Sequence, residues 1–353
     1  MGLFNFAPGV YLDQEKEPAL SRDIIPFILK NENIDDEIHD FPEKTENFSK
    51  DELIKLAKKA EIVDDNSGEM LWEKLSQYKN REISLLIGDA VDDEPYISSQ
   101  MNPLLKLSEE AVGGLRLIKE SFNCDNSCFT VYKHIFDMEI PLPKDILGVE
   151  IRRVGGKYPA EGFSANKISK NSLIVGVGAL IFLYRAANLR KKQTTTFVTV
   201  AGDCIGNPSN MELSIGMPIM NAMENRGLIK NPNRIIVGGA MSGINVTAPL
   251  NTLVTPNTKA ILSFSSKEKE KEYECIKCGK CERHCPIDLN PMLIFKALEL
   301  KEEETAVSLG ALSCAGCGVC SYVCPSKLDL SYKIRDFALK KTKEEGENAN
   351  VKQ

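Results

Sequence analysis

The sequence predicts a multidomain protein that joins an α/β domain to a β-grasp unit and an α-helical cysteine-rich module. Three observations support this fold class. A buried strand, an acidic loop and an amphipathic helix follow one another between residues 82 and 122, as in an α/β layer. Short strands separated by turn residues fill residues 195–264. Two similar cysteine-rich arms then occupy residues 275–325.

The α/β domain is expected at residues 49–190, after an N-terminal arm of residues 1–48 that has mixed charge and little periodicity. Ser49 and Glu52 have the spacing of a capping box and predict a capped helix where the domain begins. The further elements expected in this domain are a strand at 82–88, a helix at 108–122, strands at 129–135 and 149–154, and a buried helix at 172–187.

The most apolar stretch, residues 172–185, is interpreted as a core helix and not as a membrane span. It is shorter than the roughly 20 residues that a helical span needs, and it ends in Arg185. We therefore expect no transmembrane segment and a cytoplasmic location, with any association with the inner face of the cell membrane being peripheral. The net charge of −6 argues against nucleic acid as a partner.

The predicted β-grasp unit at residues 195–264 consists of a strand pair, one helix and a return strand. Residues 265–274, in which Lys and Glu alternate from Lys267 to Glu272, are expected to form a charged linker. The cysteine-rich module is expected at 275–340, with amphipathic helices between the arms and after Pro325, and a disordered tail at 341–353.

The two arms repeat the pattern C-x2-C-x2-C-x3-C-P with a constant offset of 39 residues, which indicates a duplication. Glycines within the arms let the backbone wrap closely, and the prolines turn the chain away. Eight of the eleven cysteines lie in this pattern, which favours a reducing compartment over a disulfide scaffold. The eight are Cys275, Cys278, Cys281 and Cys285 in the first arm and Cys314, Cys317, Cys320 and Cys324 in the second.

This pattern predicts two [4Fe-4S] clusters, each held by three cysteines of one arm and the proline-linked cysteine of the other. The first set is Cys275, Cys278, Cys281 and Cys324, and the second is Cys285, Cys314, Cys317 and Cys320. A pair of zinc sites is the alternative, because C-x2-C is also zinc spacing, but zinc gives the duplicated Cys-Pro no purpose. The other cysteines, Cys124, Cys128 and Cys204, are interpreted as ordinary thiols.

Several segments together resemble the RnfC family, the cytoplasmic subunit of Rnf electron-transport complexes, and its soluble relatives such as proline-reductase-associated electron-transfer proteins. The segments that carry the resemblance, besides the two arms, are the acidic loop 87–97, Lys157-Tyr158-Pro159, the stretch 200–208 and the glycine-containing segment 237–243. The resemblance implies an α/β domain like that of the flavoprotein subunit of complex I and an SLBB-type β-grasp domain. It also implies FMN and NADH binding upstream of the clusters.

The stretch 62–72, which corresponds to the family's glycine-rich flavin loop, departs from that loop. It keeps only Gly68, and it carries Asp64, Asp65 and Glu69 where a phosphate needs neutral or positive surroundings. We therefore expect that FMN and NADH are not bound. If flavin were retained, Glu94 and Tyr96 of the acidic loop would be the residues that contact it.

The favoured hypothesis is an electron-transfer protein that relays single electrons through two clusters between redox partner proteins. It would work as a subunit of an oxidoreductase in a membrane or soluble reductase complex, without catalysis of its own. One alternative is an FMN-containing, NADH-dependent subunit of the RnfC type. A second is a ligand-binding or scaffold module built on the SLBB-like domain, although residues 195–264 do not concentrate the side chains of a ligand pocket.

Overall fold

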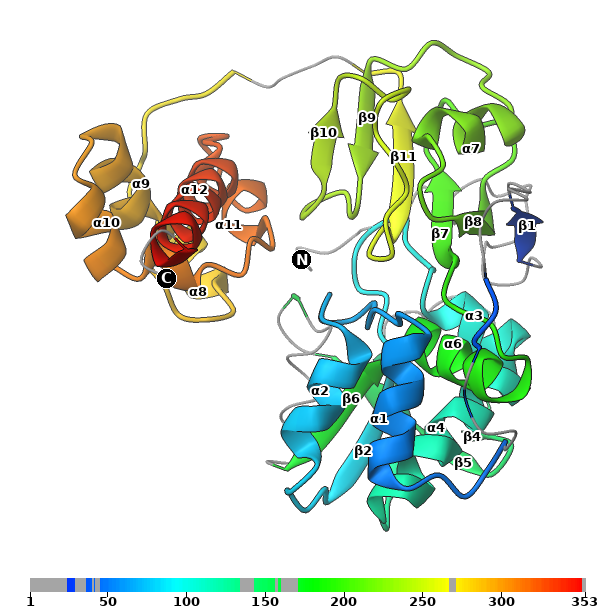
Figure 1. Ribbon diagram of the computed structural model, residues 1–353. Helices are drawn as coiled ribbons and strands as arrows, with labels where there is room; N and C mark the ends of the chain where they lie inside the picture. Colours follow the sequence, from blue (N-terminus) through cyan, green and yellow to red (C-terminus); the bar gives the residue numbers. More distant parts are fainter. Residues whose placement is uncertain are drawn as a thin grey trace. The chain divides into compact units, whose positions relative to one another are not determined.

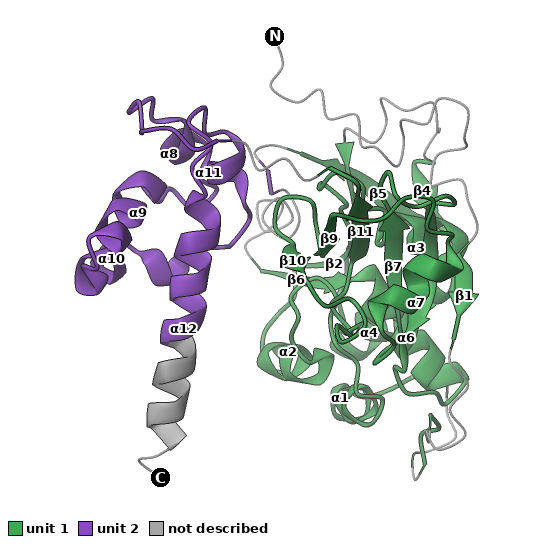
Figure 2. Ribbon diagram, turned by 90° about the horizontal axis from the view of Figure 1, so that it is seen from above, with its two compact units in different colours: residues 1–156, 160–266 green, residues 157–159, 267–353 purple. Residues whose placement is uncertain are grey.

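The computed structural model describes residues 24–28, 36–39, 41, 45–133, 143–155, 158–159, 171–266 and 271–350, without the side chains of 342–350. The chain forms two compact units (Figure 2). The first comprises residues 1–156 and 160–266, and the second comprises residues 157–159 and 267–353. Most of the predicted N-terminal arm, and residues 267–270 of the predicted linker, lie outside the described residues.

The first unit contains a five-stranded sheet in the order β4-β5-β3-β2-β6 (Figure 1). Its four longer strands are parallel, and β4 pairs with β5 as an antiparallel edge strand. This is the α/β layer that the sequence predicts. The strands are β2 (Leu85–Ala90), β3 (Ser127–Tyr132), β4 (Asp145–Ile146), β5 (Val149–Val154) and β6 (Ser172–Gly176).

Helices cover this sheet and bury one large apolar core. The capping box predicted at Ser49 and Glu52 is present at the start of the first helix. Two of the helices touch so closely that a Cβ added to Gly114 would overlap the backbone of Leu180, so only glycine fits there. The helices are α1 (Lys50–Lys59), α2 (Leu71–Tyr78), α3 (Met101–Lys106), α4 (Ser108–Phe122) and α6 (Val177–Asn188).

The prediction of a single buried helix at residues 172–187 is wrong. The stretch divides into strand β6, which pairs in parallel with β2, and helix α6, with Gly176 as the helix N-cap. Strand β6 is fully buried, and so are nine of the twelve residues of α6. Such a continuous apolar run carries no periodicity that separates a strand from a helix. Among the residues that the structure describes, no helix is long and apolar enough to cross a membrane.

A six-stranded sheet in the order β1-β8-β7-β11-β9-β10 forms the rest of the first unit. Strands β7 and β8 make an antiparallel hairpin, α7 follows, and β11 returns to lie parallel to β7. The elements are β1 (Ile25–Phe27), β7 (Thr195–Ala201), β8 (Ser209–Ser214), α7 (Ile219–Asn225), β9 (Arg234–Val237), β10 (Ile244–Val246) and β11 (Ala260–Phe264).

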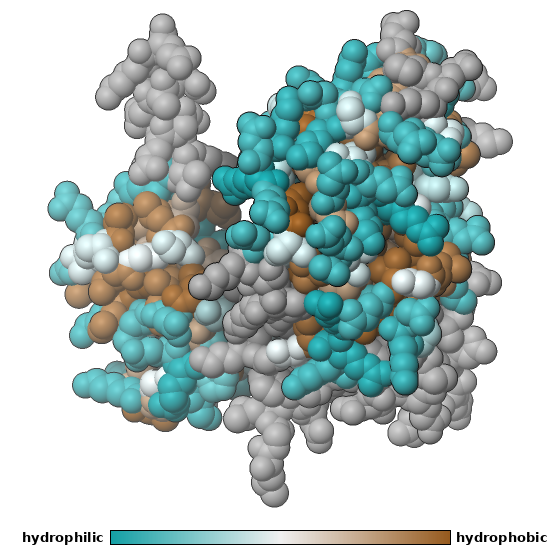
Figure 3. Space-filling model, turned by 90° about the horizontal axis from the view of Figure 1, so that it is seen from below, coloured by the Kyte–Doolittle hydropathy of each residue, from teal (hydrophilic) through white to brown (hydrophobic). Residues whose placement is uncertain are grey.

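The second unit is helical, as the sequence predicts, with a small core around Ile294, Ala306 and Ile334. Apolar side chains also reach its surface (Figure 3), among them Leu293 and Leu300. The last helix continues through residues that the sequence assigned to a disordered tail. The elements are α8 (Lys280–His284), α9 (Pro291–Glu299), α10 (Glu303–Ser308), the 3-10 helix η4 (Ala311–Ser313), α11 (Val319–Tyr322) and α12 (Leu330–Asn350).

Candidate functional site

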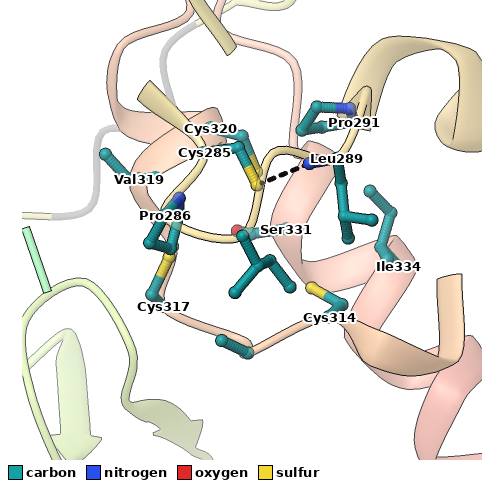
Figure 4. A pocket seen from close by; sticks show the side chains of 13 residues that line it. Cys285, Pro286, Leu289, Pro291, Cys314, Cys317, Val319, Cys320, Ser331 and Ile334 are labelled. Carbon is teal, nitrogen blue, oxygen red and sulfur yellow. Dashed lines mark hydrogen bonds between the residues drawn. The ribbon is translucent and has the colours of Figure 1, made fainter. Parts of the chain in front are cut away.

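Both cysteine arms line one cavity in the second unit (Figure 4). The first arm contributes Cys285, and the second contributes Cys314, Cys317 and Cys320, so four sulfur-bearing side chains face the same space. The empty volume is about 360 Å³, including its opening to solvent. Apolar side chains such as Leu289, Val319 and Ile334 complete the lining. The cavity therefore offers four sulfur ligands in apolar surroundings, of which Cys285 and Cys320 are buried.

The two arms have the same local geometry, as a duplication requires. Lys277 N donates to Cys275 Sγ at 3.4 Å, and the equivalent Gly316 N donates to Cys314 Sγ at 3.4 Å. Gly279 and Gly318, with φ of 68° and 80°, stand at the N-caps of α8 and α11. Backbone N–H groups thus point at sulfur in both arms, an arrangement that stabilises negative charge on ligand sulfur atoms.

The thiols of the two arms influence each other's pKa. Burial raises the pKa of Cys317 to about 11, and negative charge on Cys314 and Cys285 contributes to that shift. Burial likewise raises the pKa of Cys281, and among the remaining causes is the charge of Cys324. Cys285 lines the cavity beside the second arm's cysteines, and the charge of Cys324 acts on the thiol of Cys281.

These side chains suit a cluster of several irons. Among the described residues, no group of three His, Cys, Asp or Glu side chains is arranged to hold a single metal ion. Sulfur atoms from both arms around one apolar space are the donor set that a [4Fe-4S] cluster takes. Leu289 N also donates to Cys285 Sγ at 3.3 Å (Figure 4).

A side chain from a distant part of the sequence also contacts the second arm. Tyr158, from the short segment that groups with the second unit, donates its hydroxyl to the carbonyl oxygen of Cys317 at 3.0 Å. The Lys-Tyr-Pro turn that resembles the RnfC family therefore supports the backbone of the second arm. The neighbouring Lys157 is outside the described residues.

In the first unit, the acidic turn predicted to exclude flavin is folded against the N-terminus of α6. Asp64 accepts a hydrogen bond from Gly176 N at 2.9 Å, and Asp65 accepts from Gly178 N and Ala179 N at 3.2 and 3.0 Å. The free N–H groups at a helix N-terminus, together with its dipole, form a natural binding site for an anion. Here two carboxylates of the chain itself occupy that position.

The two aspartates are buried, and they differ in how their charge is balanced. Asp64 has no exposed surface and forms an ion pair with Lys74 of α2, which is itself largely buried. Burial raises the pKa of Asp65, and the neighbouring charge of Asp64 raises it further, although the Ala179 N–H lowers it. A Cβ at Gly176 would overlap the Asp65 carboxylate, so the close approach requires glycine.

A flavin phosphate does not fit at this helix N-terminus. The N–H groups that would bind it are already hydrogen-bonded to Asp64 and Asp65, and the carboxylates would repel its charge. The acidic residues predict repulsion of a phosphate, whereas the hydrogen-bond partners Gly176 and Gly178 were not predicted from the sequence. A strand followed by Gly-Val-Gly at a helix start was the available signal, and the single-helix interpretation of residues 172–187 concealed it.

Glu94 and Tyr96, the residues that would contact a retained flavin, are both engaged within the first unit. The Glu94 carboxylate accepts hydrogen bonds from Met241 N at 3.0 Å and Ser242 N at 3.3 Å, and from the Ser242 hydroxyl. The ring of Tyr96 packs edge-on against Phe264 at a centroid distance of 5.2 Å. These contacts connect the loop after β2 to the six-stranded sheet.

Asp92, in the same loop, is buried near the N-terminus of α3. Its carboxylate accepts hydrogen bonds from Gln100 N at 3.1 Å and Met101 N at 2.8 Å. Burial raises the pKa of this carboxyl from 3.8 to about 7, while the two N–H donors and Lys259 oppose the shift. Asp92 therefore titrates near neutral pH.

This titration predicts a pH-dependent effect of Asp92→Asn. Between about pH 4 and 7 the folded chain holds a proton that the unfolded chain has released, so the group's contribution to stability falls as pH rises and levels off above about 7. Asp92→Asn should increase the free energy of unfolding more at pH 8 than at pH 6. The slope of unfolding free energy against pH should differ between the variant and the unmodified chain by up to about 1.4 kcal/mol per pH unit.

Anaerobic urea unfolding followed by circular dichroism measures this difference. Asp125→Asn, at an exposed position after α4, serves as the matched control and should leave the slope unchanged. Equal effects of Asp92→Asn at both pH values would contradict the assignment.

The remaining cysteines have the character of ordinary buried thiols. Burial raises the pKa of Cys124 and of Cys128 to about 11, and it raises the pKa of Cys204 as well. The thiolate is the reactive form of cysteine, so a raised pKa makes these side chains poor nucleophiles at neutral pH.

Comparison with known proteins identifies the class of protein to which the cysteine arms belong. Residues 274–328 match the family described as 4Fe-4S dicluster domain, so the two cysteine arms belong to an iron–sulfur protein with two [4Fe-4S] clusters. Over 63–68% of its length the chain is also homologous to the RnfC subunits of ion-translocating oxidoreductase complexes, which confirms its resemblance to the RnfC family.

One such relative is the RnfC subunit of the proton-translocating ferredoxin:NAD(+) oxidoreductase complex of Clostridium ljungdahlii. It is 24% identical over 240 residues, which cover 63% of this chain and 52% of the relative. The equivalent subunit of the Na(+)-translocating complex of Acetobacterium woodii is 26% identical, and the match covers 63% of this chain and 54% of that relative. The chain thus spans about half the length of the curated relatives it matches.

Among solved structures, the fold is similar to a chain of the NAD+-reducing [NiFe]-hydrogenase in its air-oxidized state. The TM-score is 0.56 with 12% sequence identity, and the match covers 81% of this chain and 63% of the other. This likeness concerns the fold alone and supports the expected multidomain α/β architecture.

Proposed function

We propose that the chain relays single electrons through two [4Fe-4S] clusters between redox partner proteins. The observation that carries the proposal is the cavity lined by Cys285 together with three cysteines of the second arm. A [4Fe-4S] cluster exchanges one electron at a time when bound. The chain supplies thiolates, apolar burial, and N–H donors at Cys275, Cys285 and Cys314 that favour the charged ligand form.

We assign the ligands across the arms. The first cluster would be held by Cys275, Cys278, Cys281 and Cys324, and the second by Cys285, Cys314, Cys317 and Cys320. Support comes from the mixed lining of the cavity, where Cys285 of the first arm joins Cys314, Cys317 and Cys320 of the second. This is the arrangement that two-cluster ferredoxins use.

The chain would function without a flavin of its own, since Asp64 and Asp65 occupy the helix N-terminus where a phosphate would bind. The six-stranded sheet fits an SLBB-like β-grasp domain, supported by its hairpin, helix and return strand parallel to β7. Residues 49–190, 195–264 and 275–340 would then be three successive domains. We expect the chain to work beside other subunits, in the cytoplasm or at the inner face of the membrane.

An FMN-containing, NADH-dependent subunit is the second candidate, and the names of the relatives favour it: these are subunits of ferredoxin:NAD(+) oxidoreductase complexes. A ligand-binding role for the six-stranded sheet would predict retention of a ligand after cluster removal.

Iron, acid-labile sulfide and released flavin, measured on anaerobically purified protein, distinguish these candidates. We expect about eight iron and eight sulfide per chain with no flavin. Stoichiometric FMN would overturn the flavin-free proposal and would make NADH oxidation the next assay. Fewer than about two iron per chain after reconstitution would contradict the relay itself.

A further inference from the structure

The two arms carry different side chains on the same backbone. At the offset of 39 residues, the first arm's Lys277, Lys280 and Arg283 correspond to the second arm's Gly316, Val319 and Tyr322. Glu282 and His284 likewise correspond to the uncharged Ser321 and Val323. The first arm therefore carries three cations and one carboxylate, whereas the second arm carries no charged side chain between its cysteines.

Exposure follows the same division. Ile276, between the first two cysteines of the first arm, is 67% exposed, and Lys277 and Arg283 are also exposed. In the second arm, Val319 is 3% exposed and lines the cavity instead. An exposed apolar residue accompanied by cations thus lies directly beside three cysteines, whereas the second arm turns Val319 inward at the position of Lys280.

The orientation of the charged side chains is partly fixed. The Arg283 guanidinium lies against Gly279, where an added Cβ would be 3.0 Å from a guanidinium nitrogen. Glu282 accepts a hydrogen bond from Asn290 Nδ2 at 3.1 Å, and His284 Nδ1 is 2.8 Å from the Lys280 carbonyl oxygen. The hydrogen bond from the neutral Asn290 amide orients the Glu282 carboxylate without cancelling its charge. The surface is positive because three cations stand against this one carboxylate.

We propose that residues 275–284 form the docking surface for a small acidic electron-transfer protein. The inference rests on the proposed relay, and it names the class of partner that binds at the first arm, the more exposed of the two. The whole chain has a net charge of −6, so an acidic partner would be repelled from most of its surface and attracted to this one. Transient redox complexes have small interfaces, in which charge sets the association rate and a few apolar contacts fix the orientation.

Stopped-flow reduction of the oxidised protein tests this proposal, with a small acidic two-[4Fe-4S] ferredoxin as the reductant. For the unmodified chain, the second-order rate constant should fall about tenfold or more between low and high salt. Lys277→Glu/Lys280→Glu should lower the low-salt rate constant about tenfold and weaken its dependence on salt. The same double variant should reduce basic cytochrome c with a rate constant no lower than that of the unmodified chain.

The matched control is Lys296→Glu/Lys301→Glu, which makes the same change in net charge at positions on and after α9. Its rate constant should stay within about twofold of the unmodified chain, because screening limits the reach of a surface charge to roughly 10 Å. Equal slowing by both double variants would overturn the proposal, since net charge alone would then explain the rates.

Iron content and midpoint potentials of each variant separate this inference from the proposed function. If the unmodified chain binds no clusters, the proposed relay itself is contradicted. If the variants contain about eight iron and have unchanged potentials, but substitution of Lys277 and Lys280 leaves the rate constant unchanged, the proposed docking surface is contradicted and the proposed relay is not. Ile276→Ser should slow the reaction at high salt as well, because its contact is apolar; no change there would count against the proposed orientation.

Discussion

A double variant that lacks Cys285 and Cys320 is expected to keep about four iron atoms per chain, whereas one that lacks Cys281 and Cys285 should lose nearly all eight. If ligands come from both arms, Cys285 and Cys320 belong to one cluster, and Cys281 and Cys285 to different clusters. If each arm held its own cluster, the two results would be exchanged. The pair of variants therefore decides the assignment without identifying which cluster remains.

The measurement is iron and sulfide content after anaerobic reconstitution, with electron paramagnetic resonance of the reduced protein to detect partly assembled clusters. Cys124→Ser/Cys204→Ser is the matched control, since it also removes two cysteines, both buried in the first unit. It should keep about eight iron atoms. Partial loss of equal size in both test variants would contradict the cross-arm assignment.

The second large effect is expected at Asp64. Asp64→Ala should lower the free energy of unfolding of the first unit by about 3 kcal/mol or more, because it leaves the largely buried Lys74 without its partner and the Gly176 N–H without an acceptor. Urea unfolding followed by circular dichroism, under anaerobic conditions, measures the change.

Asp51→Ala is the matched control for this ion pair. Asp51 pairs with Lys79 on the surface, where the two side chains are 72% and 43% exposed, so its loss should cost no more than about 1 kcal/mol. Similar effects of the two substitutions would show that burial of the Asp64–Lys74 pair does not matter. Asp64→Ala/Lys74→Met should recover part of the loss, since it removes the unpaired charge.

The features that could be predicted from the sequence depend on neighbours in the chain. The spacing of the cysteines fixes where the arms curl, and Ser49 with Glu52 fixes where α1 begins, because each partner lies within a few residues. The constant offset between the arms predicts that they share one local geometry, and the equivalent hydrogen bonds to Cys275 and Cys314 agree with that prediction.

The features that the sequence could not reveal join distant segments. The hydrogen bond between Asp64 and Gly176 spans 112 residues, and that between Glu94 and Ser242 spans 148. Charge repulsion at the acidic turn was visible in the composition of the loop, but its donors were hidden until β6 and α6 were separated. Tyr158 was recognised as part of a family motif, and its hydrogen bond to Cys317 required the fold.

The Glu94 contact bears on how such sequences are interpreted. This carboxylate binds the backbone of Met241 and Ser242, and a Cβ at Gly239 would overlap it, so the Glu-Pro-Tyr loop and the glycine segment fit each other. Both segments are among those that made the chain recognisable as RnfC-like. A motif that joins one sheet to another has a structural role of its own, so its presence in a sequence indicates this architecture and does not by itself indicate a flavin site.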